Sequence, residues 1–539
     1  MSFTLATLPT TTAFLAGAAL ALVVWTASVI AYRLLFHPLA SVPGPRIAAT
    51  TRLYAFYYNN IKNGTFYLEI KRSHKIYGPV VRIAPNEIHL TDPSHYDTIY
   101  AIGGKFYKDA VFYSGIGDEY SGFATISNED HRRRRAPLES FFSRRAVLEL
   151  EGVVRDKVEK LCRLVDGGLA QGKAIDLHAA FRGVSIDVIT EYAFDDCWNQ
   201  LDLPDLGQWF SDMGQNVGVS FWITQQFPLV LKGIKALPLW IVRTLGPAMS
   251  DVLDCQERGR RIVEEIHGKV EKGVKPRRRT IFHNLLDPEV KIAGHQRPSV
   301  ENMVEEAFSI LIAASDTTGN AMTVAAYHVI TNPRVYAKLM AELIEAFPDD
   351  GVDNMSFSQL ERLPCLTGVV KEGLRLAYGV IGRLPRVVPR GGATFNGFYF
   401  AEGTTVGMSS YLLHRNPDAF PNPTAFEPER WISPDPEVSK AMRACLVLFS
   451  RGSRGCIGQN LAMCELYLTL GTLFRRVQNM AAEDVGELRY VDYFTAYHGE
   501  ERQRLKVFSK SSLRTQSQTR RARGHRPLTR KRCSSPPSQ

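Results

Sequence analysis

A glycine-rich turn around one cysteine carries the clearest chemical signal in the sequence. Residues 449–458 read Phe-Ser-Arg-Gly-Ser-Arg-Gly-Cys-Ile-Gly, with the cysteine at position 456. Glycines let a backbone approach a flat ligand closely. A helix-forming run, residues 459–474, begins just after the cysteine, so its dipole and the adjacent Arg451 and Arg454 favour a thiolate, a suitable iron ligand. Taken alone, an isolated cysteine at a glycine turn is more often structural.

A second signal is an acid–alcohol pair within an apolar helical stretch. Asp316, followed by Thr317, is the only Asp, Glu, Lys or Arg between Glu306 and Arg334. A carboxylate in apolar surroundings is costly unless it has a partner or a chemical task. Out of context, an exposed aspartate on the polar stripe of the helix is the favoured reading.

Two further pairs of charged residues have helical spacing. Glu372 and Arg375 are three residues apart, and His131 and Arg135 are four apart, so each pair shares a helix face. An exposed pair of this kind contributes only about a few tenths of a kcal/mol to the stability of the folded protein. The residues alone therefore leave a surface ion pair and a solvated arginine run, 132–134, as open readings.

Taken together, these stretches resemble the cytochrome P-450 superfamily. The cysteine turn matches Phe-x-x-Gly-x-Arg-x-Cys-x-Gly, and five motifs occur in the family's order over about residues 35–509. The resemblance implies haem b with Cys456 as axial thiolate. It also implies a proton relay by Asp316 and Thr317, and a buried structural cluster of Glu372, Arg375 and Arg430. The other implied haem-binding residues are Phe449, Gly452, Arg454, Gly458, His131, Arg135 and Arg386. His414 is expected to be structural, and Ala314 stands where the family usually has Gly.

The elements that must position these residues are mostly helices. Pro298-Ser299 supplies a helix start, and no further proline occurs until Pro333, which predicts one long helix between them. Residues 383–411 instead show short β-type runs broken by glycines. The expected fold is mostly α with minor β: a cytochrome P-450 fold with a single haem-centred catalytic domain behind an N-terminal transmembrane helix.

The two ends of the chain are predicted to lie outside that domain. Ala13–Tyr32 is an uncharged apolar stretch long enough to span a bilayer, and arginines follow it, which places the body in the cytosol. A cleaved signal peptide is the alternative. We expect a membrane anchor at 1–34, the catalytic domain at 35–509 and a basic disordered tail at 510–539.

Composition excludes several other classes of protein. Of the net charge of +10, the 30 residues of the tail contribute nine Lys and Arg and no acid, which leaves +1 for the rest. Global basicity is therefore no argument for nucleic-acid binding, and none is expected. The eight cysteines form no CxxC pair or zinc spacing and are too sparse for a disulfide scaffold.

The resemblance implies a monooxygenase of the endoplasmic reticulum membrane, single-pass, with a cytosolic catalytic domain. It would use O2 and electrons from NADPH, delivered by NADPH–cytochrome P-450 reductase, to hydroxylate or epoxidise a small hydrophobic substrate. Residues 131–144 resemble fungal secondary-metabolism members such as trichodiene oxygenase, which favours a terpenoid. A polyketide or alkaloid-derived scaffold, a haem-thiolate isomerase or dehydratase, and a non-catalytic haem carrier remain alternatives. The expected substrate-lining residues are Phe112, Tyr113, Phe123, Phe308, Ile312, Val380, Ile381, Leu384 and Phe494.

Overall fold

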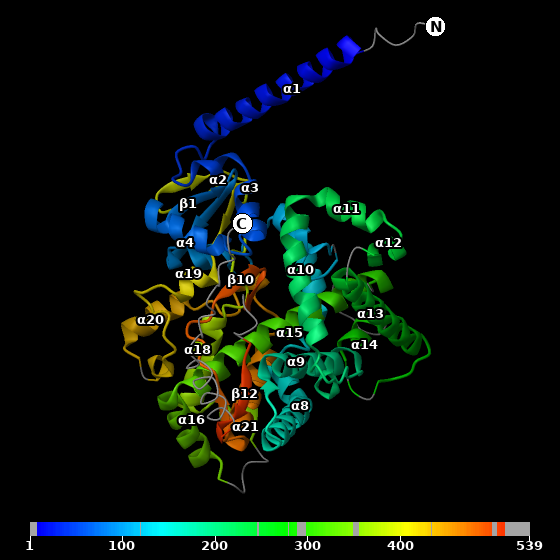
Figure 1. Cartoon of the computed structure of the whole chain (residues 1–539), viewed down its shortest axis with the longest axis vertical. Helices are drawn as coiled ribbons and strands as arrows, with labels where there is room; N and C mark the ends of the chain where they lie inside the picture. Colours follow the sequence, from blue (N-terminus) through cyan, green and yellow to red (C-terminus); the bar gives the residue numbers. More distant parts are fainter. Residues whose placement is uncertain are drawn as a thin grey trace, which may run out of the picture.

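One 32-residue helix, α15 (Val300–Thr331), runs through the middle of the protein and organises the helices around it (Figure 1). The computed structural model describes residues 8–118, 120–244, 247–276, 278, 280–287, 298–348, 355–432, 434–498 and 504–511. Ser299 caps α15 by accepting the Asn302 N–H, and the helix ends before Pro333, as the sequence predicts. From residue 512 on, the predicted tail lies outside the described residues.

Six helices pack directly on α15. They are α9 (Leu177–Phe194), α10 (Gln208–Gln226), α13 (Pro247–Glu271), α16 (Pro333–Ala346), α18 (Pro364–Ala377) and α21 (Gln459–Arg476), while α8 (Arg144–Ala170) lies against α9 and α21. The largest hydrophobic core forms where these helices meet. Because α9 is buried on nearly every side, its apolar residues are spread around the whole helix, and even its polar side chains, such as Arg182 and Asp187, are buried.

Shorter helices complete the outer layers. They are α2 (Arg46–Thr50), α3 (Leu53–Phe56), α4 (Phe66–Tyr77), α5 (Tyr96–Ile99), α6 (Ala110–Tyr113), α7 (Asn128–Glu139), α11 (Pro228–Ala236), α12 (Leu239–Thr244), α14 (Ile281–Leu286), α17 (Phe357–Leu360), α19 (Ser410–His414) and α20 (Pro436–Cys445). The mostly α class is therefore confirmed.

The β structure is confined to small sheets. The largest has the order β1-β2-β8-β5-β3 and joins β1 (Val80–Ala84), β2 (Glu87–Leu90), β8 (Thr405–Gly407), β5 (Arg386–Val387) and β3 (Tyr107–Lys108). The others pair β6 (Ala393–Phe395) with β7 (Phe398–Phe400), β10 (Tyr490–Tyr493) with β11 (Thr495–His498), and β12 (Lys506–Ser509) with β4 (Ile175–Asp176) and β9 (Met480–Ala482). The strands within 383–411 were predicted, whereas the β1–β2 hairpin was not, although Pro85-Asn86 between its two apolar runs is a recognisable turn signal.

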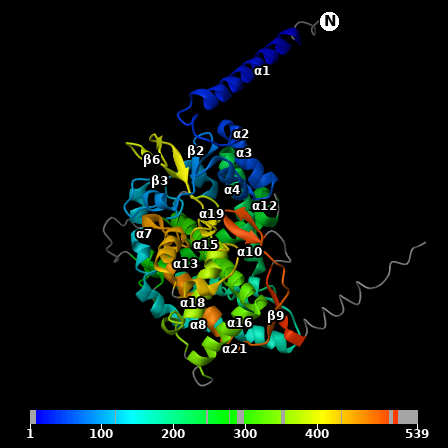
Figure 2. The same cartoon turned by 90° about the vertical axis from the view of Figure 1, so that its left-hand side faces the viewer.

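The N-terminal helix α1 (Leu8–Ala31) stands apart from the rest of the molecule (Figures 1 and 2). Its apolar stretch, Thr12–Phe36, includes a short π-helical turn and is long and apolar enough to cross a bilayer, with none of its hydrophobic window buried in the protein. An unburied apolar helix is what the predicted anchor requires, and Figure 2 shows it leaving from the end that carries β2, β3 and β6.

Candidate active site

The Cys456 turn is a backbone structure in which glycine is needed at one position. The Cys456 N–H donates to the Phe449 carbonyl at 2.9 Å and the Gly455 N–H to the Gly452 carbonyl at 2.9 Å. Gly452 has φ +71°, and a Cβ there would lie 2.1 Å from the Tyr100 carbonyl oxygen. Any larger residue would clash with that backbone, so glycine at position 452 has a steric cause, whereas a Cβ at Gly458 would make only an ordinary contact with the Cys456 Sγ, at 3.9 Å.

The thiol of Cys456 is accessible and lies just before the start of α21. Gly458 forms the N-cap of that helix, which agrees with the expected position of the cysteine at a helix N-terminus. The surrounding protein raises the pKa of the Cys456 thiol, while the Gly458 N–H and the Arg135 guanidinium act in the opposite direction. In the protein alone, desolvation by the atoms packed around the turn therefore outweighs the groups that favour a thiolate.

The two arginines expected beside that thiol are engaged elsewhere. Arg451 pairs with Asp97 at 2.8 Å, and Arg454 donates to backbone carbonyls of residues 125–127 and to Asn128. Arg135 takes the expected role instead, since its guanidinium donates to the Gly455 carbonyl at 2.8 Å. The expectation that Arg451 and Arg454 stabilise the thiolate is thus corrected, because both side chains are held by nearer acceptors.

A basic cluster lies beside the cysteine turn. It consists of five residues from four segments: Lys108, His131, Arg135, Arg386 and Arg454. Lys108, His131 and Arg386 are buried. Burial first, and the neighbouring basic groups second, lower the pKa of His131 to about 3 and that of Arg454 to about 10. Within the described residues, only Arg135 of the five forms an ion pair, with the exposed Glu139 at 3.0 Å.

Four of the predicted haem-binding residues thus lie together in the basic cluster: His131, Arg135, Arg386 and Arg454. The fifth member, Lys108, was not predicted from the sequence. No motif marks this lysine. It is buried because β3 pairs with β5, which aligns Lys108 with Arg386 across the sheet.

This donor set fits haem b. One accessible thiol, at a turn that needs glycine at position 452, matches an iron ligand. The basic side chains beside it are buried or half-buried and mostly lack acidic partners, so anions would stabilise them. The two propionates of haem b would supply them. Two sets of residues from the sequence analysis, the thiol turn and the propionate candidates, are linked directly by the Arg135–Gly455 contact.

The acid–alcohol pair of α15 points in two directions. Thr317 lies with Ala313 on an accessible strip of the helix, and its hydroxyl donates to the Ala313 carbonyl at 3.0 Å. Asp316 lies about 100° around the helix and is buried. Ala314, in place of the family's glycine, is accommodated within a continuous α-helix.

Asp316 has partners that the sequence does not reveal. The Arg182 Nε, from α9, donates to its Oδ1 at 2.8 Å, and the Tyr497 hydroxyl, from β11, donates to its Oδ2 in a short hydrogen bond. Gly214 of α10 makes room, since a Cβ there would lie 2.6 Å from Oδ2. Arg182 lies 134 positions and Tyr497 181 positions away in the chain, so only the fold brings them to the carboxylate.

The predicted Glu372–Arg375–Arg430 cluster is assembled and buried. The Glu372 carboxylate accepts from Arg375 at 2.7 and 2.8 Å, from Arg430 at 2.9 Å and from the Trp431 indole at 3.1 Å. Arg375 also donates to three backbone carbonyls, those of residues 414, 423 and 425. The surface-pair reading is therefore wrong, because neither Glu372 nor Arg375 has any exposed side-chain surface.

His414 extends this cluster toward the cysteine turn. It is fully buried, its Nδ1 lies 3.0 Å from the Arg375 carbonyl, and its Nε2 accepts the Val447 N–H at 3.1 Å. These partners require a neutral ring protonated at Nδ1, and burial lowers its pKa to about 3. The structural role predicted for His414 is consistent with these contacts.

Aromatic side chains gather around the segment that precedes α7. Phe112 and Tyr113 form a buried cluster with Phe221 and Trp222 of α10, and Phe494 packs against it. Phe123 is 40% exposed and contacts both Tyr113 and Phe494, with ring centroids 5.9 and 5.7 Å apart. The sequence analysis named four of these residues and missed the two from α10, whose apolar pattern resembles that of any core helix.

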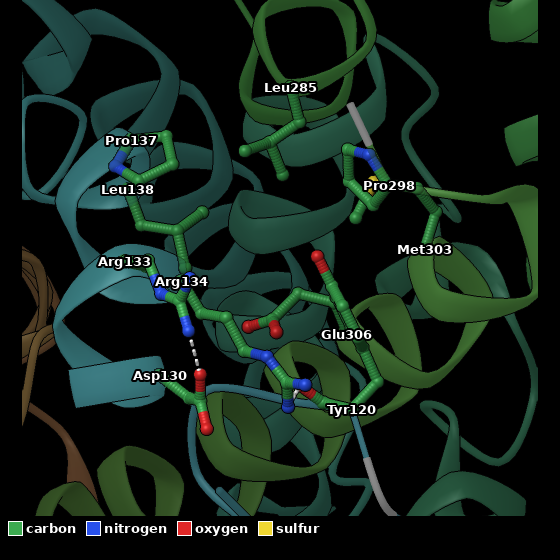
Figure 3. Close-up of a pocket in the computed structure, with 10 residues that line it drawn as sticks. All are labelled: Tyr120, Asp130, Arg133, Arg134, Pro137, Leu138, Leu285, Pro298, Met303 and Glu306. Atoms are coloured by element: carbon green, nitrogen blue, oxygen red, sulfur yellow. Dashed lines mark hydrogen bonds and ion pairs between the residues drawn. The ribbon is translucent and has the colours of Figure 1, made fainter. Parts of the chain in front are cut away.

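A separate pocket lies between α7, α14 and the start of α15 (Figure 3). Arg133 pairs there with Asp130, and Arg134 turns inward to donate to the Tyr120 carbonyl at 2.5 Å and the Thr125 hydroxyl at 2.8 Å. Arg134 is thus unavailable to a docking surface, while Arg132 and Arg133 stay exposed. The pocket contains neither the cysteine turn nor the acid–alcohol pair.

The sequence and the fold were compared with those of known proteins. The family model described as cytochrome P-450 matches residues 43–487. A cytochrome P-450 monooxygenase of Ascocoryne sarcoides is 39% identical over 472 residues, covering 85% of this chain and 90% of that protein. N-acetyltryptophan 6-hydroxylase of Emericella nidulans is 35% identical and covers 83% of this chain and 87% of its own length. The crystal structure of the haem domain of cytochrome P-450DA superposes with a TM-score of 0.63 at 19% identity, covering 84% and 94% of the two chains.

Proposed function

Because the chain belongs to the cytochrome P-450 family, we propose that it is a membrane-anchored haem-thiolate monooxygenase that hydroxylates or epoxidises a hydrophobic secondary metabolite. The observation that carries this proposal is the accessible Cys456 thiol linked through Arg135 to the basic cluster. When bound, haem b supplies the oxygen-activating chemistry, in which one atom of O2 enters the substrate and the other leaves as water. Electrons would come from NADPH through its cytochrome P-450 reductase.

Each group of site residues has a distinct task in this proposal. Cys456 would hold the iron, with Phe449, Gly452 and Gly458 shaping the turn, and the basic cluster would bind the propionates. Glu372, Arg375 and Arg430 would keep the core behind the cofactor rigid. Exposed Arg132 and Arg133 are the charges left to attract an acidic reductase surface.

Proton delivery is assigned to the acid–alcohol pair. The accessible Thr317 hydroxyl would hold a proton near the reacting oxygen, and Asp316 would resupply it. Since the Asp316 carboxylate is paired with Arg182 and accepts from the Tyr497 hydroxyl, it must leave or share those partners to serve Thr317. This pair favours the monooxygenase over an isomerase or dehydratase, which would need no such relay; strict dependence of turnover on NADPH and O2 separates them.

The proposed substrate is a terpenoid, with an indole-containing or alkaloid-derived compound as the second candidate. The rings of Phe112, Tyr113, Phe123 and Phe494 pack against one another, and a substrate site bounded by this aromatic cluster would suit either class. The name of the N-acetyltryptophan 6-hydroxylase, 35% identical, favours the second candidate.

A titration of the detergent-solubilised haemoprotein with terpenoids, polyketides and N-acetyltryptophan, following the Soret band, tests the substrate proposal. A high-spin shift with one class identifies it. A shift with N-acetyltryptophan alone would overturn the terpenoid preference, and the absence of a haem band would overturn the proposed function itself.

The location proposed is the endoplasmic reticulum membrane, with the catalytic domain in the cytosol. Besides α1, the helices α11 and α12 expose large apolar side chains, among them Leu229 at 79%, Trp240 at 70% and Leu239 at 65%. Phe227 before α11 contacts Phe56 of α3, and both views place α12 at the same end as α2 and α3 (Figures 1 and 2). These helices would rest on the bilayer that α1 spans.

Vesicle flotation of the chain without residues 1–34 tests that contact. We expect the shortened chain to retain some binding to vesicles and its Trp240→Asp variant to lose it. Equal binding of the shortened chain with and without Trp240→Asp would refute the contact of α11 and α12 with the bilayer.

A further inference from the structure

The pocket between α7, α14 and the start of α15 has no task in the proposed function (Figure 3). Its volume is about 180 Å³, and a cavity of about 150 Å³ is enough to hold a benzene molecule. Asp130 and Arg133, whose side chains are about half exposed, mark its open side. The inner walls are apolar and consist of Pro137, Leu138, Leu285, Pro298 and Met303. The pocket therefore has room and a suitable lining for a small organic molecule.

A carboxyl group, that of Glu306, lines this pocket without a cationic partner. Only 6% of the residue is exposed. Its Oε2 accepts the Gly122 N–H at 2.8 Å, whereas Oε1 accepts no hydrogen bond and neither oxygen forms an ion pair within the described residues. Figure 3 shows this carboxyl group among the lining side chains. A buried carboxylate is costly unless a cation or a hydrogen-bond donor reaches it, so Oε1 points to a missing partner.

The two arginines that line the pocket are engaged with other acceptors. Arg134 donates to the Tyr120 carbonyl at 2.5 Å and to the Thr125 hydroxyl at 2.8 Å, and its guanidinium lies 4.2 Å from the centroid of the Tyr120 ring. Arg133 pairs with Asp130. Neither guanidinium is therefore paired with the Glu306 carboxylate, and a ligand would have to supply the compensating charge.

We infer that this pocket is a second ligand site, which binds a small organic cation that has an apolar body and an ammonium or amidinium head. The head would donate to the Glu306 Oε1, and the body would lie against Leu138, Leu285 and Met303. An anion would meet the Glu306 carboxylate, and an apolar molecule without a donor would leave Oε1 unsatisfied. The site is separate from the cysteine turn and goes beyond the proposed function.

Isothermal titration calorimetry of the purified holoprotein with benzamidine tests this inference, with benzamide as the neutral probe of nearly the same shape. The variants are Glu306→Gln and, as the matched control, Glu301→Gln, which changes an exposed acid in the first turn of the same helix. We expect the wild type and Glu301→Gln to bind benzamidine about tenfold more tightly than benzamide, or better. Glu306→Gln should lose that preference, because the charge-assisted hydrogen bond is removed.

The pH dependence gives a second readout that needs no variant. Burial and the nearby Asp118 raise the pKa of Glu306 to about 7, while the Gly122 N–H and Arg134 act in the opposite direction. Because Glu306 must be ionised to pair with the cation, wild-type affinity for benzamidine should rise between pH 6 and 8. The pKa of Asp118 is raised to about 6, so its ionisation adds to the lower part of this rise, whereas Asp130 is already ionised and the arginines stay charged.

The Soret band, recorded during the same titrations, locates the bound probe. We expect it to stay unchanged, because the pocket contains no residue of the cysteine turn. Binding that always accompanies a Soret shift would place benzamidine at the haem and overturn the inference.

Three other results would overturn the inference. They are equal affinity of the wild type and Glu306→Gln for benzamidine, wild-type affinity that does not change between pH 6 and 8, and tighter binding of benzoate than of benzamidine, which would show an anion site. Failure of the wild type to bind haem would overturn the proposed function alone, since the calorimetric comparison does not depend on the haem.

Discussion

Replacing Glu372 with glutamine should remove most of the folded, haem-loaded protein. Glu372 is the carboxylate for two guanidinium groups, those of Arg375 and Arg430, whose side chains are 0% and 7% exposed. Glutamine keeps the shape of the side chain but leaves the buried Arg375 without its anion, while Arg430 retains only the part-exposed Glu427, at 3.0 Å. Removing one partner of a buried pair costs about 3–5 kcal/mol, a large fraction of the ~5–15 kcal/mol that stabilises a typical domain.

The assay is urea unfolding followed by tryptophan fluorescence, with haem content measured on the same preparations. A graded comparison makes the result interpretable: Trp431→Phe removes one neutral donor to the Glu372 carboxylate at 3.1 Å and should cost about 1.5–3 kcal/mol. The control, Glu149→Gln, breaks an exposed pair with Arg145 at 3.1 Å and should cost less than about 1 kcal/mol. Wild-type haem content and an unchanged unfolding midpoint in Glu372→Gln would refute the reasoning.

Three other predictions concern proton delivery, pH and the tail. Thr317→Ala should consume NADPH without matching product formation, whereas Thr317→Ser should stay coupled; equal coupling in wild type and Thr317→Ala would exclude the assigned role. Burial raises the pKa of Glu465 to about 8, so the native state holds a proton that the unfolded state releases, and stability should fall as pH rises from about 4.5 to 8. Glu465→Gln should flatten that dependence in unfolding midpoints, and an unchanged slope would contradict it. Truncation after Lys510 should preserve haem content and activity, and loss of either would show that the tail contributes to the fold.

Features that depend on residues close together in the chain could be predicted from the sequence. The Ser299 cap and the prolines at 298 and 333 defined α15, and the glycine spacing defined the Cys456 turn, because both depend on residues close together in the chain. The Glu372–Arg375 pairing could be foreseen from helical spacing, but its complete burial came from the family resemblance.

Long-range contacts could not be predicted in this way. Arg182 and Tyr497 reach Asp316 from α9 and β11, and nothing near either residue in the sequence indicates that partner. Lys108 looked like an ordinary lysine because its burial depends on the pairing of β3 with β5. Likewise, Arg451 and Arg454 lie next to Cys456 in the sequence, yet nearer acceptors orient them away from the thiol.

The carbon monoxide difference spectrum of the reduced, purified protein tests the central claim most directly. We expect the red-shifted Soret band of a thiolate-ligated haem in the wild type and in Cys197→Ser, which changes a cysteine outside the turn. Cys456→Ser should lose that band while keeping its helical content by circular dichroism. A thiolate-type band that persists in Cys456→Ser, or that is missing from haem-loaded wild type, would contradict the assignment of Cys456 as the haem ligand.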